Sequence, residues 1–116
     1  MKKIQTVKNK YVDRDYNVHI EFQEFTCVCP RTGLPDFANI IIDYVPGKKL
    51  IELKSLKYYF VSYRQEGTFH EAVVNKILDD LVAACRPRKM QVVGEFSVRG
   101  GIETTVSSCY PPPGEV

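Results

Sequence analysis

The sequence lacks any long hydrophobic run. Its longest apolar stretches are short segments such as residues 40–42 and 81–84, whereas a membrane-spanning helix needs about 20 apolar residues in a row. The apolar core of a signal peptide is also missing, because residues 9–15 are mostly polar or charged. The sequence therefore predicts a cytoplasmic protein with no membrane partner.

There is little excess charge of either sign. Sixteen basic residues against fourteen acidic ones give a net charge of +2, which is too small to predict a nucleic-acid partner. Hydrophobic residues make up 44% of the chain and charged residues 26%, and this composition excludes a disordered or low-complexity chain. The length predicts a single domain over residues 1–116, with an N-terminal arm at 1–16 and a tail at 111–116.

Two common ligand-binding motifs are absent. Gly100-Gly101 lacks the remaining residues of a glycine-rich dinucleotide loop. Cys27 and Cys29 form a C-x-C pair, which is not the C-x₂₋₄-C spacing of zinc sites. We therefore expect no metal site, and in a reducing compartment the four cysteines should be free thiols.

The hydrophobic pattern predicts an α+β fold. Alternating apolar residues indicate strands near 17–23, 37–45, 89–98 and 102–109, while helical spacing indicates helices near 52–64 and 70–85. Thr68 and Glu71 have the spacing of a capping box, and a short ordered piece is expected near Tyr11. This ββααββ order predicts a four-stranded antiparallel sheet with both helices on one face. Its uncovered edges favour pairing with another chain.

The loop that starts at Cys29 is the first candidate for chemistry. Cys29 follows a strand and opens a rigid loop that returns at Asp36. A thiolate is a strong nucleophile once its pKa falls, and Arg31 could lower it; a nearby carboxylate can transfer a proton. On pattern alone, the simpler interpretation is favoured, in which Cys29 is a small buried side chain and Asp36 a turn residue.

Charged residues on the two helices are weaker candidates. Glu71 begins a helix and could bind the N–H edge of a purine-like ring, although a cap would explain it equally well. Lys54 and Lys57 share one helix face. They either lie on a solvated surface or, together with Arg99, form a phosphate-binding site made of side chains.

Four ordered stretches together resemble one known family, the NADPH-dependent 7-cyano-7-deazaguanine reductases, or QueF nitrile reductases. These stretches are CPRTGLPDF at 29–37, ELKSLKYY at 52–59, FHE at 69–71 and RGGI at 99–102. The resemblance covers residues 16–110. It implies a tunnelling fold whose subunits join edge to edge into a barrel, in a ring-stacked homo-oligomer with a decamer as the expected size.

The resemblance also implies roles for individual residues in the synthesis of queuosine for tRNA. Cys29 would attack the nitrile to form a thioimide and Asp36 would donate a proton, while two NADPH per turnover supply hydride. The substrate pocket would be lined by Ile51, Glu52, Leu53, His70 and Glu71. NADPH phosphates would be held by Lys54, Lys57 and Arg99.

Two alternative functions remain open at this point. A QueF-like amidinotransferase forms the same thioimide on tRNA but uses ammonia, and that class lacks the lysine-bearing octapeptide found here at 52–59. A non-catalytic pterin- or purine-binding module could share the scaffold, since fold alone does not fix function. The intact Cys29 and Asp36 argue against such a module.

Overall fold

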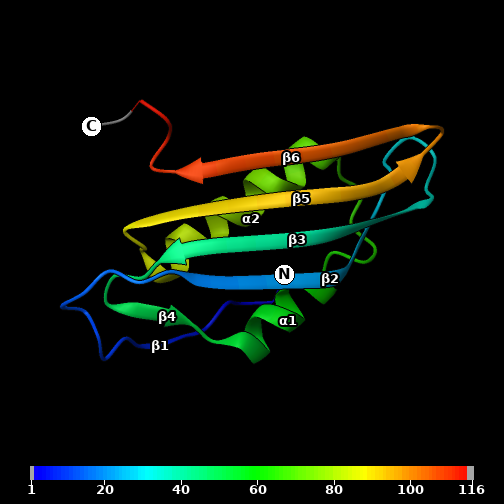
Figure 1. Ribbon diagram of the computed structural model, residues 1–116. Coiled ribbons are helices and arrows are strands. Elements are labelled where there is room, and N and C mark those ends of the chain that lie inside the picture. The colour runs from blue at the N-terminus through cyan, green and yellow to red at the C-terminus, as the bar shows by residue number, and fades with distance from the viewer. Residues whose placement is uncertain (1, 115–116) are drawn as a thin grey trace.

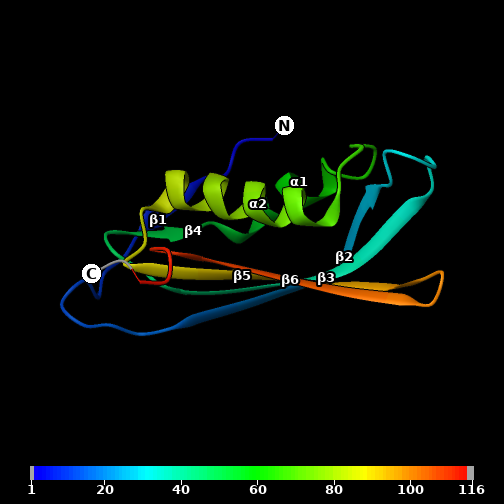
Figure 2. The same cartoon turned by 90° about the horizontal axis from the view of Figure 1, so that it is seen from above.

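The computed structural model describes residues 2–114 (Figure 1). Two helices and six strands follow the chain in the order β1 (Thr6–Lys8), β2 (Val18–Val28), β3 (Pro35–Val45), β4 (Lys49–Ile51), α1 (Leu53–Val61), α2 (His70–Cys85), β5 (Lys89–Arg99) and β6 (Ile102–Tyr110). Four long strands form an antiparallel sheet in the order β2-β3-β5-β6. Both helices cover one face of this sheet and leave the other face open (Figure 2). The predicted α+β architecture is thus confirmed.

The core lies between the helices and the sheet. The predicted apolar stripe of α2 is buried, with Val74, Ile77 and Leu81 fully inaccessible to solvent. Gly94 in β5 allows α2 to pack closely, because a Cβ atom at this position would lie 2.7 Å from Val74 Cγ2. The close packing of α2 fixes where its first residue, His70, meets the end of the sheet.

An irregularity in β2 explains why the predicted strand was too short. The pairing register with β3 shifts between Phe22 and Phe25, as expected for a β-bulge. Before the bulge, even-numbered residues such as Phe22 face the helices; after it, Phe25 and Cys27 do so and are completely buried. Because of this shift, the alternation visible in the sequence ends at residue 23, although the strand continues to Val28.

Two local expectations are wrong. The capping box at Thr68 does not form, because α2 begins one residue later, with Phe69 as its N-cap and no side-chain hydrogen bond there. The ordered piece of the N-terminal arm lies at Thr6–Lys8 rather than near Tyr11, and this strand pairs with β4. The arm is anchored because Ile4 and Asn9 are buried on either side of that strand.

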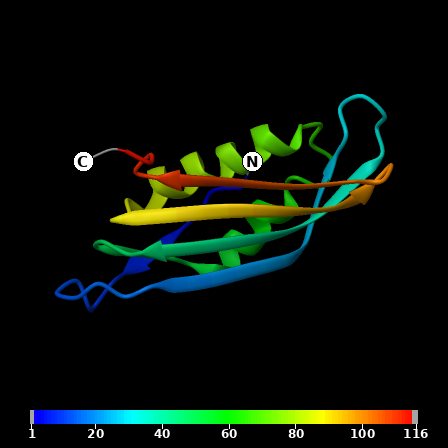
Figure 3. The same cartoon turned by 45° about the horizontal axis from the view of Figure 1, so that its top comes forward.

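The predicted hairpin turn forms at Gly100-Gly101. Both glycines have positive φ angles, of 59° and 81°, which suit a two-residue turn between antiparallel strands. This turn, the loop after β2 and the start of α2 all lie at the same end of the sheet (Figure 3). Within residues 2–114, no helix is both long and apolar enough to cross a membrane. The last two residues of the expected tail, 115–116, lie outside the described residues.

Candidate active site

The loop after β2 holds Cys29 in a closed turn. The backbone N–H of Cys29 donates to the carbonyl of Leu34, and that of Gly33 donates to the carbonyl of Cys29, each at 2.9 Å. Gly33 has a φ of 74°, a conformation that glycine adopts without steric cost. The hydroxyl oxygen of Thr32 accepts the N–H of Leu34 at 3.2 Å. This network keeps the half-buried Cys29 at the mouth of the loop.

The turn also favours the thiolate form of Cys29. The Thr32 hydroxyl is the largest cause of a lowered pKa at this thiol, followed by the backbone N–H groups of Arg31 and Thr32. Asp36 acts in the opposite direction, because its negative charge opposes a second one nearby. Arg31 therefore helps through its backbone rather than through its side chain. The result is a partly exposed thiol that ionises more readily than an ordinary cysteine.

Asp36 is a buried carboxylate beside this loop. It pairs with Cys27 across the sheet, and only 7% of its surface is exposed. Its Oδ1 lies 3.3 Å from Nε of Arg99, and its Oδ2 lies 3.3 Å from Nε2 of His70. Arg99 also donates to the carbonyl of Pro35. Asp36 is thus in direct contact with two other residues predicted for the site, His70 and Arg99.

The ring of His70 is held flat against Phe96. The two rings stack at a centroid distance of 3.8 Å with an angle of 5° between their planes. His70 is the first residue of α2 and Phe96 comes from β5. Glu71 follows His70 in the first turn of the helix and is exposed to solvent. Two elements therefore fix the imidazole that contacts Asp36.

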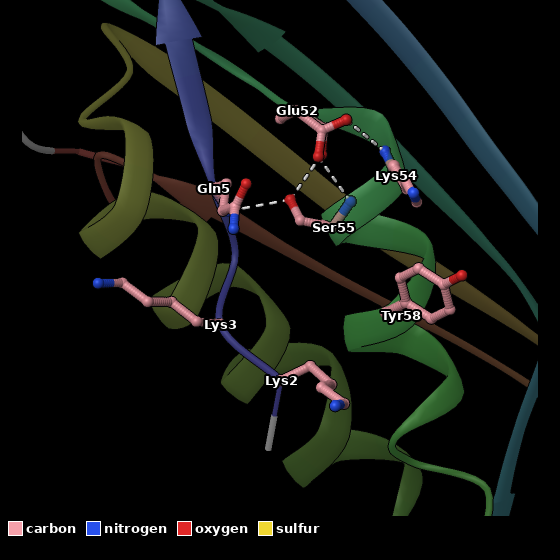
Figure 4. A pocket seen from close by; sticks show the side chains of 7 residues that line it. All are labelled: Lys2, Lys3, Gln5, Glu52, Lys54, Ser55 and Tyr58. Atoms are coloured by element: carbon pink, nitrogen blue, oxygen red, sulfur yellow. Dashed lines mark hydrogen bonds between the residues drawn. The ribbon is translucent and has the colours of Figure 1, made fainter.

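A second group of predicted residues surrounds the start of α1. Glu52 is the N-cap of this helix, and its carboxylate accepts the N–H groups of Lys54 at 2.7 Å and Ser55 at 2.8 Å. These bonds lower the pKa of Glu52. A cavity of about 440 Å³ opens here (Figure 4). Its lining is formed by Lys2, Lys3, Gln5, Glu52, Lys54, Ser55 and Tyr58.

The predicted site residues therefore form two groups within one chain. Cys29, Asp36, His70 and Arg99 lie together at one end of the sheet. The segment Ile51–Leu53 and Lys54 lie at the start of α1, apart from the Cys29 loop in Figures 1 and 3. Ile51 is buried, whereas Leu53 and Lys57 are exposed. Lys57 is not among the residues that line the cavity.

Two residues that contact the first group were not predicted from the sequence. Thr32 was part of the loop motif, but only the folded turn shows its hydroxyl acting on Cys29. Phe96 lies in the strand predicted near 89–98, and its contact with His70 depends on how α2 meets β5. Within residues 2–114, no group of three or more His, Cys, Asp and Glu side chains is placed to hold a metal ion.

An α+β domain that holds a half-buried thiol of lowered pKa near a buried carboxylate has the arrangement typical of thiol-dependent enzymes. Residues 35–114 match the model of a protein family described as QueF-like protein. The chain is 54% identical over 113 residues to the NADPH-dependent 7-cyano-7-deazaguanine reductase of Nitrosococcus oceani, covering 97% of this chain and 88% of that protein. It therefore belongs to the family of NADPH-dependent 7-cyano-7-deazaguanine reductases.

Further comparisons agree with this membership. Reductases of the same name from Nitrosomonas europaea and Chloroherpeton thalassium are 59% and 52% identical, covering 90% and 92% of this chain and 76% and 92% of those proteins. A solved structure, the apo form of the archaeosine synthase QueF-Like, matches with a TM-score of 0.75. It covers 80% of this chain and 91% of that one at 24% identity, which shows a shared fold and no more.

Proposed function

We propose that this chain reduces the nitrile of 7-cyano-7-deazaguanine to a primary amine with NADPH, through a covalent bond to Cys29. The family gives the substrate and the cofactor. The observation that carries the mechanism is the pairing of a thiol of lowered pKa with a buried carboxylate at one end of the sheet. The product, 7-aminomethyl-7-deazaguanine, is a precursor of queuosine in tRNA.

Cys29 is the proposed nucleophile. A nitrile carbon accepts hydride poorly until one of its bonds to nitrogen is broken. Attack by the Cys29 thiolate forms a C–S bond and converts the C≡N group to C=N, with the electron pair moving to nitrogen. The hydrogen bonds from Thr32 and Arg31 keep a fraction of the thiol ionised for this attack. They also stabilise the thiolate when the C–S bond breaks later.

Asp36 is the proposed proton donor to the nitrile nitrogen. Its carboxyl group lies beside the Cys29 loop and is shielded from water, so its proton passes directly to the nitrogen of the new C=N group and gives C=N–H. His70 and Arg99 hold the two oxygens of this group from opposite elements, which fixes its direction. NADPH supplies the two hydrides when it is bound, and two protons complete the conversion to the amine.

The substrate-binding residues come from both groups. His70 presents a fixed ring beside Asp36, and the exposed Glu71 carboxylate is free to accept the N–H edge of the deazaguanine. The segment Ile51–Leu53 is proposed as the other wall, supplied by a neighbouring copy of the chain because it lies apart from Cys29 within one copy. Lys54, Lys57 and Arg99 are proposed to hold the phosphates of NADPH, and the lysine-lined cavity has the charge that this requires.

This arrangement calls for a homo-oligomer. Strands β2 and β6 are the edges of the sheet, and unpaired edges readily join those of another copy. We propose edge-to-edge barrels stacked in rings, with ten copies as the expected number. The small-molecule substrate needs no nucleic-acid contact, and a reaction that uses a free thiol and NADPH is suited to the reducing cytoplasm.

The test is a turnover assay with 7-cyano-7-deazaguanine and NADPH. We expect about two NADPH oxidised for each amine formed, because a nitrile takes up two hydrides. A covalent adduct without any NADPH oxidation would contradict reduction and favour the amidinotransferase function, to be tested with tRNA and ammonia. Binding of the nitrile without an adduct would favour a non-catalytic module.

A further inference from the structure

The cavity at the start of α1 contains positive charge from two distant parts of the sequence. Lys54 belongs to the helix, whereas Lys2 and Lys3 come from the N-terminal arm. Figure 4 shows the arm running alongside α1, with Lys2 and Lys54 on the side of this helix and the Lys3 side chain extended to the other side of the arm. We propose that Lys2, Lys3 and Lys54 together bind the 2′-phosphate of NADPH. The N-terminal arm would then determine the preference for NADPH over NADH.

The arm is held firmly in this position. The N–H of Gln5 donates to Oγ of Ser55, and the N–H of Glu52 donates to the carbonyl of Gln5, each at 2.9 Å. Thr6 then pairs with Ile51 in the β1–β4 ladder. Lys3 and Lys2 are therefore two and three residues from the fixed backbone of Gln5. Their ammonium groups can reach the cavity without ordering a long flexible segment.

The charge in the cavity is available for an anion. Glu52 is the one carboxylate among the lining residues, and both of its oxygens are bonded to N–H groups of the helix. Within residues 2–114, none of the three lysines forms an ion pair. Three unpaired ammonium groups match a phosphate monoester, which carries close to two negative charges at neutral pH.

An aromatic ring lies beside these lysines. Tyr58 lines the same cavity and is 48% exposed. An exposed tyrosine ring can stack on adenine. In NADPH the 2′-phosphate and the adenine are attached to the same ribose, so a cationic group next to an aromatic ring suits this end of the cofactor. In contrast, each phosphate of the NADPH pyrophosphate carries one negative charge and does not lie next to a base.

This inference rests on the proposed use of NADPH, and binding can be measured without catalysis. The probes are adenosine 2′,5′-bisphosphate and adenosine 5′-monophosphate, titrated by calorimetry into the full chain and its variants. We expect the double variant K2A/K3A to bind the bisphosphate about 10-fold more weakly, with the monophosphate changed by less than about 2-fold. The variant Y58A should weaken both ligands alike.

The control is K8A/K10A, which removes the same charge from exposed lysines of the arm outside the cavity. It should leave both affinities unchanged. An equal loss of both ligands in K2A/K3A, or no loss, would overturn the proposal. Adduct formation with 7-cyano-7-deazaguanine needs none of these lysines, so it should persist in K2A/K3A. If the wild-type protein forms no adduct but still binds the bisphosphate through Lys2 and Lys3, the proposed function is contradicted. The phosphate site proposed here is then supported.

Discussion

Cys27 and Cys29 are two residues apart, yet the structure gives them opposite chemistry. Cys27 lies inside β2 and is completely buried against the helices, and burial raises the pKa of its thiol to about 11. Cys29 lies just after the strand, where the hydroxyl and N–H groups of the turn lower its pKa. The difference comes from the backbone: in the strand the N–H groups pair with β3, while in the turn they point toward the thiol. Reactivity here depends on where a strand ends.

The largest contrast should appear when each cysteine is removed. We expect C29A to abolish amine formation and nitrile adduct formation, because no other thiol can replace the nucleophile. The matched control is C109A, which removes a partly exposed cysteine from β6 and should retain turnover. Adduct formation in folded C29A, measured by intact mass, would break the comparison.

Replacing Asp36 should have the next largest effect. We expect D36N to slow amine formation about 10²- to 10⁴-fold, the usual contribution of a general acid. The fold should remain, because asparagine keeps the size of the side chain. The control is D79N, an exposed carboxylate of α2. A D36N rate within a few fold of wild type would exclude Asp36 as the proton donor.

A smaller effect on the reactivity of Cys29 should come from changing the turn that holds it. T32V removes the hydroxyl that most lowers the pKa of Cys29. A higher thiol pKa leaves less thiolate at neutral pH, so the pH profile of Cys29 alkylation should move to higher pH. The rate at pH 7 should fall about 2- to 10-fold, the worth of one hydrogen bond. T32S keeps the hydroxyl and should retain the wild-type profile, whereas an unchanged profile in T32V would show that the hydroxyl has no such role.

The smallest catalytic effect should come from Cys27. C27A leaves the turn intact, so turnover should stay close to wild type. Loss of a buried sulfur should lower the free energy of unfolding by about 1 kcal/mol, measured by urea denaturation. Lost turnover in folded C27A would mean that the two thiols act together.

Much of the fold was predictable because its elements follow simple periodicities. The stripe of α2 from Val74 to Cys85 and the turn at Gly100-Gly101 are local signals, and both are found in the structure. The bulge at Phe22 and Phe25 was not predictable, since a register shift depends on the partner strand. The strand at Thr6–Lys8 also depends on a distant partner, β4, and three residues are too short to show a pattern.

The site was predictable only in part. Cys29 and Asp36 lie seven residues apart at the two ends of one loop, so the sequence could bring them together. The contacts of Asp36 with His70 and Arg99 join three elements that are far apart in the chain. The cavity lined by Lys2, Lys3 and Lys54 depends on how the arm lies against the start of α1. In both cases the residues become neighbours only in the folded chain, so no local sequence pattern predicts their contact.

The most direct test of the central claim is to locate the nitrile adduct on the chain. The protein is mixed with 7-cyano-7-deazaguanine without NADPH, digested, and its peptides are analysed by mass spectrometry. We expect one substrate mass added to the peptide containing the 29–37 loop, with fragment ions placing it on Cys29 and leaving Cys27 unmodified. An adduct on Cys27, or modification spread over several cysteines, would contradict the claim that the turn after β2 creates the nucleophile.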